Sequence, residues 1–263
     1  MKNFIKTKNL IIMGIIILMY SCGTKEVVYN DETEYFETKK GILYYKGIPF
    51  DGKLKEYFKD SDIPHLETSL ISIKSYSGGK LDGITEMFDY GVLDVKESYK
   101  DDVLDGLYEE YFENGQIKIK GDYLNGNLNG VWTKYFEDGK IKSIQEYNKN
   151  GDPSGRWEFF SQDGSLLSKY NYINGQLDGE IETFYEDNWG GKGFLKEKGR
   201  YLSGEKDGLW VENYSSGRTK SVINYSNGIL NGSYNTLYEE PNDTNEKGNY
   251  INGKKDGEWT TVN

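Results

Sequence analysis

The chain has 263 residues, a formal net charge of −11 and no alanine, whereas glycine is abundant and aromatic residues make up 15%. Removing residues 1–21, which hold three lysines and no acid, leaves 29 basic against 43 acidic residues, a charge of −14. Such a chain is expected to repel nucleic acid and anionic membrane surfaces. The charge either attracts a basic partner or, in the favoured interpretation, only keeps an extended sheet soluble. Helices favour alanine and strands favour aromatic residues, so the composition predicts an all-β fold.

Residues 1–21 are typical of a secretory signal peptide. Lys2, Lys6 and Lys8 precede an apolar run of residues 10–20, which is too short to span a bilayer as a helix. The run ends at Ser21 and Cys22, which resemble the lipobox of bacterial lipoproteins, where a small residue precedes a cysteine that becomes diacylated. Cys22 is the only cysteine, so an internal disulfide is excluded.

Lipid attachment at Cys22 therefore predicts a membrane-anchored protein of the cell envelope, held outside the cytoplasm without a spanning helix. The alternative is a signal anchor with a free Cys22. Residues 22–40 are polar and acidic. We predict a lipidated N-terminus and tether there, with one short strand near Val27 or Tyr35.

A sequence repeat fills residues 41–263. The unit that begins at Tyr123 has a glycine three residues later, a second glycine at seven, an aromatic residue at nine and another at twelve, and a third glycine at sixteen, and this pattern recurs along the chain with variations. Self-similarity at a fixed period is the signature of a repeat architecture. The repeat tyrosines are Tyr45, Tyr76, Tyr99, Tyr123, Tyr147, Tyr172, Tyr201, Tyr225 and Tyr250.

The second glycine occurs in every repeat, and the residue before it is usually Asp or Asn, which together give a strong turn signal with positive φ. These glycines are Gly52, Gly83, Gly106, Gly130, Gly155, Gly179, Gly208, Gly232 and Gly257. The third glycines lie between two strand-like runs and predict two-residue hairpins of type I′. They occur in Asn114-Gly115, Asp138-Gly139, Asp163-Gly164 and Ser216-Gly217. Together the turns predict an elongated, single-layer antiparallel meander of about nine two-stranded hairpins.

Two columns of mostly aromatic residues run through the repeats. The first contains Tyr108, Trp132, Trp157, Trp210, Tyr234 and Trp259, and the second contains Tyr111, Tyr135, Phe160 and Phe184. A single sheet has no second layer, so we expect these rings to bury one another as ladders. If the tryptophans were exposed instead, they would stack on sugar rings.

The sequence contains few of the residues from which catalytic sites are built. With one histidine and one cysteine, no nucleophile–base arrangement is available, and no zinc pattern, acidic metal loop or phosphate-binding glycine loop is present. We therefore predict no catalytic residue, metal site or cofactor. His65 is interpreted as a loop residue in an insertion at 59–69, and the pair Glu109-Glu110 as solvated. Longer hairpin tips at 187–193 and 240–246 are candidate binding loops or neutral drift.

The repeat resembles the MORN repeat, and more closely its bacterial variant with the pattern Gly-x-Trp-x-x-Tyr, Asn/Asp-Gly and Tyr-x-x-Gly. Gly130, Trp132, Tyr135 and Gly139 fit this pattern, and the resemblance covers about residues 41–263. It implies a β-hairpin meander that acts as a scaffold or binding surface. Many such bacterial proteins are catalogued as antitoxin components of toxin–antitoxin systems, a role that fits a lipoprotein signal poorly.

The sequence thus predicts a lipid-anchored, non-catalytic scaffold for protein interaction. The alternatives are an antitoxin or immunity-type protein that masks a toxin, and a carbohydrate-binding module of the cell envelope. The last strand, through Trp259 and Thr261, is expected to present an open edge to a second copy or a partner strand. Lys254 and Lys255 are expected to precede that strand.

Overall fold

The computed structural model describes residues 26–28, 33–57, 69–186, 192–237 and 245–262. Apart from one 3-10 turn, its regular elements are β-strands, as predicted. The chain divides into two compact units, Met1–Leu107 and Tyr108–Asn263, and the division falls within strand β10 (Val103–Tyr111). The signal peptide, Cys22, His65 and most of the two long hairpin tips lie outside the described residues.

The first unit contains a small sheet and the first hairpins of the repeat. Strands β2 (Phe36–Lys39), β3 (Ile42–Tyr45) and β4 (Ile48–Pro49) form a separate three-stranded sheet, preceded by the 3-10 turn Thr33–Tyr35. The remaining strands are β1 (Glu26–Val28), β5 (Gly52–Tyr57), β6 (Leu70–Ser77), β7 (Lys80–Leu81), β8 (Gly83–Asp89) and β9 (Val92–Lys100).

The first described residue, Glu26, lies within the segment expected to be a tether. The short strand predicted near Val27 is confirmed as β1, which pairs in parallel with β5 through Val27 and Leu54. Val27 is buried because it packs in the core cluster with Tyr45, Phe50 and Leu54. This apolar contact holds a polar segment onto the first repeat.

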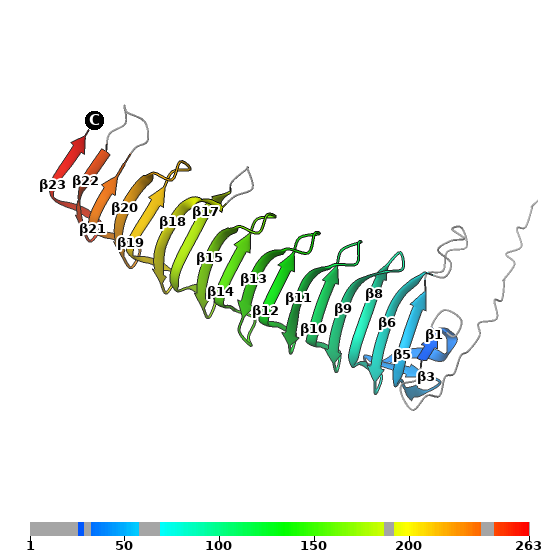
Figure 1. Cartoon of the computed structure of the whole chain (residues 1–263). Helices are drawn as coiled ribbons and strands as arrows, with labels where there is room; N and C mark the ends of the chain where they lie inside the picture. Colours follow the sequence, from blue (N-terminus) through cyan, green and yellow to red (C-terminus); the bar gives the residue numbers. More distant parts are fainter. Residues whose placement is uncertain (1–25, 29–32, 58–68, 187–191, 238–244, 263) are drawn as a thin grey trace, which may run out of the picture. The chain divides into compact units, whose positions relative to one another are not determined.

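The second unit is an antiparallel meander in which each strand lies beside the next in chain order (Figure 1). From β11 to β17 the strands are β11 (Ile117–Leu124), β12 (Asn127–Tyr135), β13 (Ile141–Tyr147), β14 (Pro153–Phe160), β15 (Leu166–Ile173), β16 (Gln176–Leu177) and β17 (Gly179–Glu186). They continue with β18 (Lys192–Leu202), β19 (Glu205–Asn213), β20 (Thr219–Ser226), β21 (Ile229–Thr236), β22 (Asn245–Ile251) and β23 (Lys254–Val262). Lys254 and Lys255 therefore belong to the last strand and do not precede it.

Type I′ turns close most hairpins on the side of the repeat tyrosine, whereas residues 148–152 form a three-residue loop there, in which Gly151 N donates to Asn148 O and Asn148 N donates to Asp152 O. Asn125 and Gly126 have φ values of 49° and 82°, and they connect the paired residues Leu124 and Asn127. Positive φ at both residues of a two-residue loop defines the type I′ turn, which suits the twist of the flanking strands. The same loop recurs at Asn174-Gly175, Ser203-Gly204, Asn227-Gly228 and Asn252-Gly253.

The opposite hairpin tips were predicted as type I′ turns, and that prediction is wrong. At the tip after β10, Gly115 N donates to Phe112 O over 2.8 Å, and Phe112 N donates to Gln116 O over 2.8 Å. Gly115 has positive φ but Asn114 does not. This is a three-residue loop, a type I turn followed by a G1 bulge. The same bonds recur around Gly139, Gly164 and Gly217.

The second glycines have positive φ in all nine repeats, as predicted, but most of them do not form hairpin turns. Gly130 lies inside β12, where the pairing with β11 shifts between Lys120 and Asp122. It therefore occupies a β-bulge, which accommodates an extra residue within the strand. The second glycine has a φ value of 61–70° in the repeats where tryptophan follows it by two residues. In the other repeats its φ value is 101–110°, apart from Gly52 at 142°.

Hydrogen bonds between successive hairpins stack the type I′ turns. The turn amide of Gly175 donates to Pro153 O over 2.8 Å, and that of Gly253 donates to Leu230 O over 2.9 Å. The Asp or Asn before the second glycine reaches forward as well. Asp178 accepts from Ser203 N over 3.0 Å, and Asn231 accepts from Asn252 N over 3.2 Å. This contact with the next hairpin explains why Asp or Asn precedes the second glycine better than the formation of a hairpin turn does.

Candidate interaction surface

The tryptophan column lies on one face of the second unit's sheet, called here the tryptophan face. Trp132 and Trp210 are only 6% and 4% exposed. Trp132 packs with its ring centroid 5.3 Å from that of Tyr108 and 5.1 Å from that of Tyr123. The rings therefore bury one another, and two of the four aligned tryptophans are unavailable for stacking on a sugar.

Each buried tryptophan occupies a slot above a glycine of the neighbouring strand. A Cβ atom added to Gly121 would lie 2.6 Å from Trp132 Cγ, and one added to Gly199 would lie 2.6 Å from Trp210 Cε3. The indole N–H of Trp132 then donates to the backbone oxygen of Asp122 over 3.1 Å. Gly248 lies beneath the ring of Trp259 in the same way, but the buried indole N–H of Trp259 has no hydrogen-bond partner among the described residues.

These slot glycines were missed in the sequence analysis, although a signal was present. Gly121, Gly199 and Gly248 each precede their tryptophan by eleven residues and stand two residues before a repeat tyrosine. In the repeat of Trp157, Gln145 takes this place and is buried, while Trp157 is half-buried. The glycine therefore sets how deeply the indole enters the sheet.

Two tryptophans carry a lysine over the ring. Lys206 Nζ lies 3.7 Å from the centroid of Trp210 and bonds to Glu197 over 2.9 Å. In the repeat of Trp132, Leu128 stands at the position equivalent to Lys206, and Ile119 at the position equivalent to Glu197. An apolar pair therefore replaces the ion pair in that repeat. A cation over an indole face gains from the ring quadrupole, and the lysine stem shields the ring from water.

The second aromatic column lies on the opposite face of the sheet. Successive strand residues point to alternate faces, and Tyr135 follows Trp132 by three positions, an odd number. We call this half-buried set and its cross-strand partners the aromatic band. The band consists of Tyr111, Tyr135, Phe160, Phe184, Ile141, Leu166 and Leu195.

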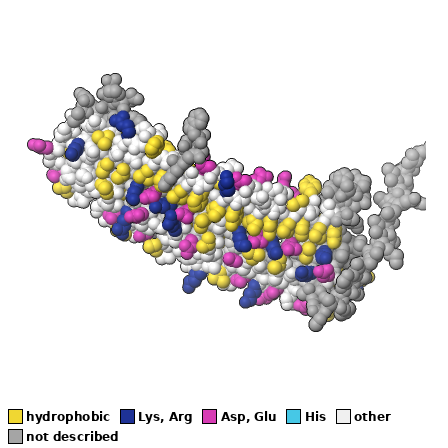
Figure 2. All heavy atoms as spheres, in the orientation of Figure 1, with side chains coloured by type: hydrophobic (Ala, Val, Ile, Leu, Met, Phe, Trp, Pro, Cys, Tyr) yellow, Lys and Arg dark blue, Asp and Glu magenta, His cyan; other side chains and the backbone are white. Residues whose placement is uncertain are grey.

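Charged residues alternate beside the aromatic band. Glu182 lies between Lys169 and Lys198, with N–O distances of 2.7 and 3.0 Å, across three neighbouring strands. The hydrogen bond from Lys169, together with that from Lys198, holds the pKa of Glu182 below its ordinary value. Figure 2 shows a hydrophobic band over β10–β15, with basic and acidic side chains interspersed next to it.

Glu109 was predicted to be solvated and is in fact 8% exposed. Tyr111 Oη donates to Glu109 Oε2 over 2.7 Å, and Lys120 Nζ lies 3.1 Å from Oε1. A buried carboxylate needs such partners, because desolvation would otherwise favour its neutral form. Glu109 is therefore part of the support of the aromatic band.

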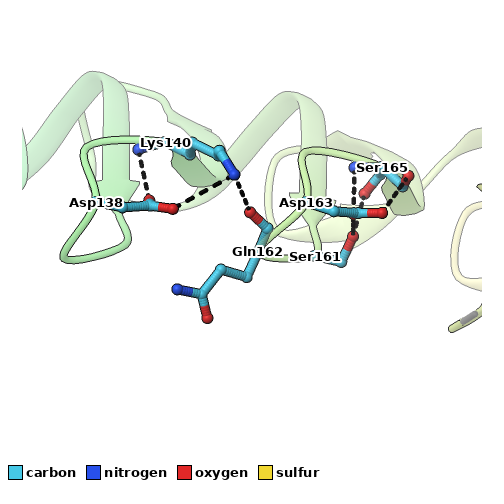
Figure 3. Close-up of polar contacts among 6 residues, drawn as sticks. All are labelled: Asp138, Lys140, Ser161, Gln162, Asp163 and Ser165. Carbon is cyan, nitrogen blue, oxygen red and sulfur yellow. Dashed lines mark hydrogen bonds and ion pairs between the residues drawn. The ribbon is translucent and has the colours of Figure 1, made fainter. Parts of the chain in front are cut away.

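The G1 tips are linked to one another by polar contacts. Lys140 N donates to Asp138 Oδ1 over 3.1 Å, and Lys140 Nζ crosses to Gln162 O of the next tip over 2.9 Å (Figure 3). The hydrogen bond from Lys140 N holds the pKa of Asp138 below its ordinary value. Asp163 accepts from Ser165 N over 2.9 Å in the equivalent place. These carboxylates serve to order the tips.

Within the described ranges, no group of His, Cys, Asp and Glu side chains has the geometry of a metal site. The same part of the chain contains no helix that is long and apolar enough to cross a membrane.

The regular units at the centre of the chain, with their bulge glycine, indole and G1 tip, are the part that a family model recognises. Three consecutive repeats match the model of the MORN repeat variant. The matches cover residues 104–125, 128–149 and 153–174. MORN repeats are generally modules that bind proteins or membranes, and this scaffold fits a non-enzymatic repeat protein.

The other comparisons add little. A search of curated proteins gave no match. Among solved structures, a GtfA/B complex bound to UDP and GlcNAc matches with 13% identity and a TM-score of 0.17. The match covers 38% of this chain and 19% of that chain, so this chain spans a small part of it. A TM-score this low carries no argument about the MORN-variant repeats.

Proposed function

We propose that this chain is a lipid-anchored scaffold outside the cytoplasm that binds a basic protein through the aromatic band and performs no catalysis. The observation that carries the proposal is the half-exposed state of the band, in contrast to the buried Trp132 and Trp210. Aromatic residues inside a polar rim are typical of protein interfaces. The charge of −14 for residues 22–263 favours a basic partner through electrostatic steering.

The partner is tested by site-specific photo-crosslinking in intact cells. A benzophenone side chain at Ile141, a band residue that is 39% exposed, should crosslink to one discrete protein with a basic isoelectric point. The same probe at Ile173, 58% exposed and outside the band, is the matched control. Equal crosslinking from both positions, or an acidic product from Ile141, would contradict the proposal.

The anchor is tested by metabolic labelling with a palmitate analogue. The wild type should take up the label and fractionate with membranes, because an acyl chain on Cys22 supplies the membrane affinity. Cys22→Ala should lose both properties. A wild-type protein that is unlabelled and soluble would exclude the lipoprotein interpretation.

A further inference from the structure

The anchor, if it is Cys22, lies very close to the folded part of the chain. Only residues 23–25 separate Cys22 from the start of β1 at Glu26. A fully extended chain spans at most about 3.5 Å per residue, so this link reaches roughly 14 Å. The segment expected to act as a long tether is therefore mostly part of the fold. Unit 1 is held close to the bilayer at its β1 end.

The small sheet of β2–β4 is fixed to that same end. Its Tyr45 packs in the core cluster that contains Val27 of β1. The backbone of this sheet and of Phe50, which follows it, is also bonded to the β6–β7 turn, because Leu43 N donates to Gly79 O over 2.8 Å and Gly79 N donates to Phe50 O over 2.8 Å. Whatever surface this sheet exposes is therefore carried toward the membrane with β1.

The small sheet differs in chemistry from the rest of the chain. Its two type I′ turns, at opposite ends of β3, place lysine in the left-handed conformation, Lys40 at φ 51° and Lys46 at φ 52°. Among the described non-glycine residues with positive φ, lysine occurs at these two positions alone, and asparagine is the usual residue elsewhere. Asparagine tolerates this conformation better than lysine, so turn geometry does not account for the choice.

Apolar groups stand beside Lys46. Ile48 is 63% exposed, Tyr35 is exposed, and Lys46 Nζ lies 4.6 Å from the Tyr35 ring centroid. We call Tyr35, Lys46 and Ile48 the cap patch, while Lys40 lies at the other end of β3. Residues 33–49 hold three lysines and two glutamates, a charge of +1, in a chain that carries −14 over residues 22–263.

We propose that the cap patch lies in the headgroup region of an anionic bilayer and sets the orientation of unit 1 on the membrane. The inference rests on the proposed lipid attachment at Cys22. Lysine with tyrosine and an exposed aliphatic side chain is the composition found at membrane interfaces, where the ammonium meets lipid phosphate and the apolar part enters the acyl boundary. The acidic remainder is repelled by the same surface, which favours contact through this end.

The test uses the full lipidated chain on vesicles with about 30 mol% phosphatidylglycerol in phosphatidylethanolamine, where surface charge attracts lysine. Because Cys22 is the only native cysteine, Ile48→Cys adds the single free thiol for an environment-sensitive fluorophore. Tyr90→Cys is the control, since Tyr90 is 77% exposed at the β8–β9 turn of the same unit. Headgroup spin-labelled lipid should quench the probe at residue 48 about threefold more than the probe at residue 90.

Charge reversal separates the patch from the lipid anchor. Lys46→Glu should reduce quenching at residue 48 to the level of residue 90, whereas Lys100→Glu, a change of equal charge, should leave it unchanged. Circular dichroism checks that both variants fold. Equal quenching at residues 48 and 90 in a protein that floats with vesicles would overturn the inference alone. If the protein took up no palmitate label, the result would instead contradict the proposed lipid attachment at Cys22.

Discussion

Gly121→Ala should destabilise the second unit by displacing the indole of Trp132. The new Cβ would lie 2.6 Å from Trp132 Cγ and closer still to Cδ2 and Cε2, and a ring that is 6% exposed has little room to move. Overpacking of this kind costs about 1–3 kcal/mol. A displaced ring would also weaken its hydrogen bond to Asp122 O, worth about 1 kcal/mol. We expect a loss of about 2–4 kcal/mol in the free energy of unfolding.

The assay is urea unfolding followed by tryptophan fluorescence, with hydrogen exchange to locate the damage in β11–β13. The compensating variant combines Gly121→Tyr with Trp132→Ile, which copies the natural pairing of Tyr170 with Ile181 in a later repeat. The double variant should be more stable than the sum of its single changes by at least about 1 kcal/mol, because the two side chains share one slot.

Gly115→Ala is the control, since Gly115 has φ of 80° with open space around it. That change should cost only the backbone strain of a left-handed alanine, about 1 kcal/mol. If Gly121→Ala left the free energy of unfolding within about 0.5 kcal/mol of wild type, the slot would not be tight and the reasoning would fail.

Three further outcomes are expected. Gly130→Asn should lower the free energy of unfolding, measured by chemical denaturation, by less than about 1 kcal/mol, because φ of 67° suits asparagine. Gly179→Asn should lower it by more than about 2 kcal/mol, because φ is 110° and Asn171 Cβ would lie 3.2 Å from the added Cβ. Protection from hydrogen exchange around Glu182 should be lost as pH falls below about 4.5 through its lowered folded-state pKa, and Lys169→Gln should shift that loss upward; an unchanged midpoint would contradict the linkage. Among the described residues β23 pairs with β22 alone, so Thr261→Pro should reduce self-association measured by light scattering; an unchanged mass would exclude this edge as the contact.

The period of the repeat was sufficient to predict an antiparallel meander, but the same dipeptide serves three local structures. Asn125-Gly126 closes a hairpin, Asn129-Gly130 lies in a bulge four residues later, and Asn114-Gly115 forms a G1 tip. Each supplies positive φ, so local chemistry does not separate them. What separates them is the number of residues between paired positions of the two strands, which depends on the register of the whole hairpin.

The two aromatic columns were recognised from the sequence, yet their different roles were not. The odd spacing of Trp132 and Tyr135 already places them on opposite faces, given a strand. Which face is buried depends on partners in other strands, such as the slot glycine Gly121 beneath the indole. The burial of Glu109 likewise depends on Tyr111 and Lys120, and no local pattern marks it.

The bonds that stack the type I′ turns all run in one direction along the chain. The amides of Gly175, Gly204, Gly228 and Gly253 donate backward, to carbonyls of the hairpin that precedes them. During synthesis or export from the N-terminus, the acceptor carbonyls of one hairpin are therefore already formed when the turn amides of the next hairpin fold. In the reverse order, the turn amides would have no acceptor until the preceding hairpin had formed. The array is suited to vectorial assembly, and a repeat added on the C-terminal side brings its own donors with it.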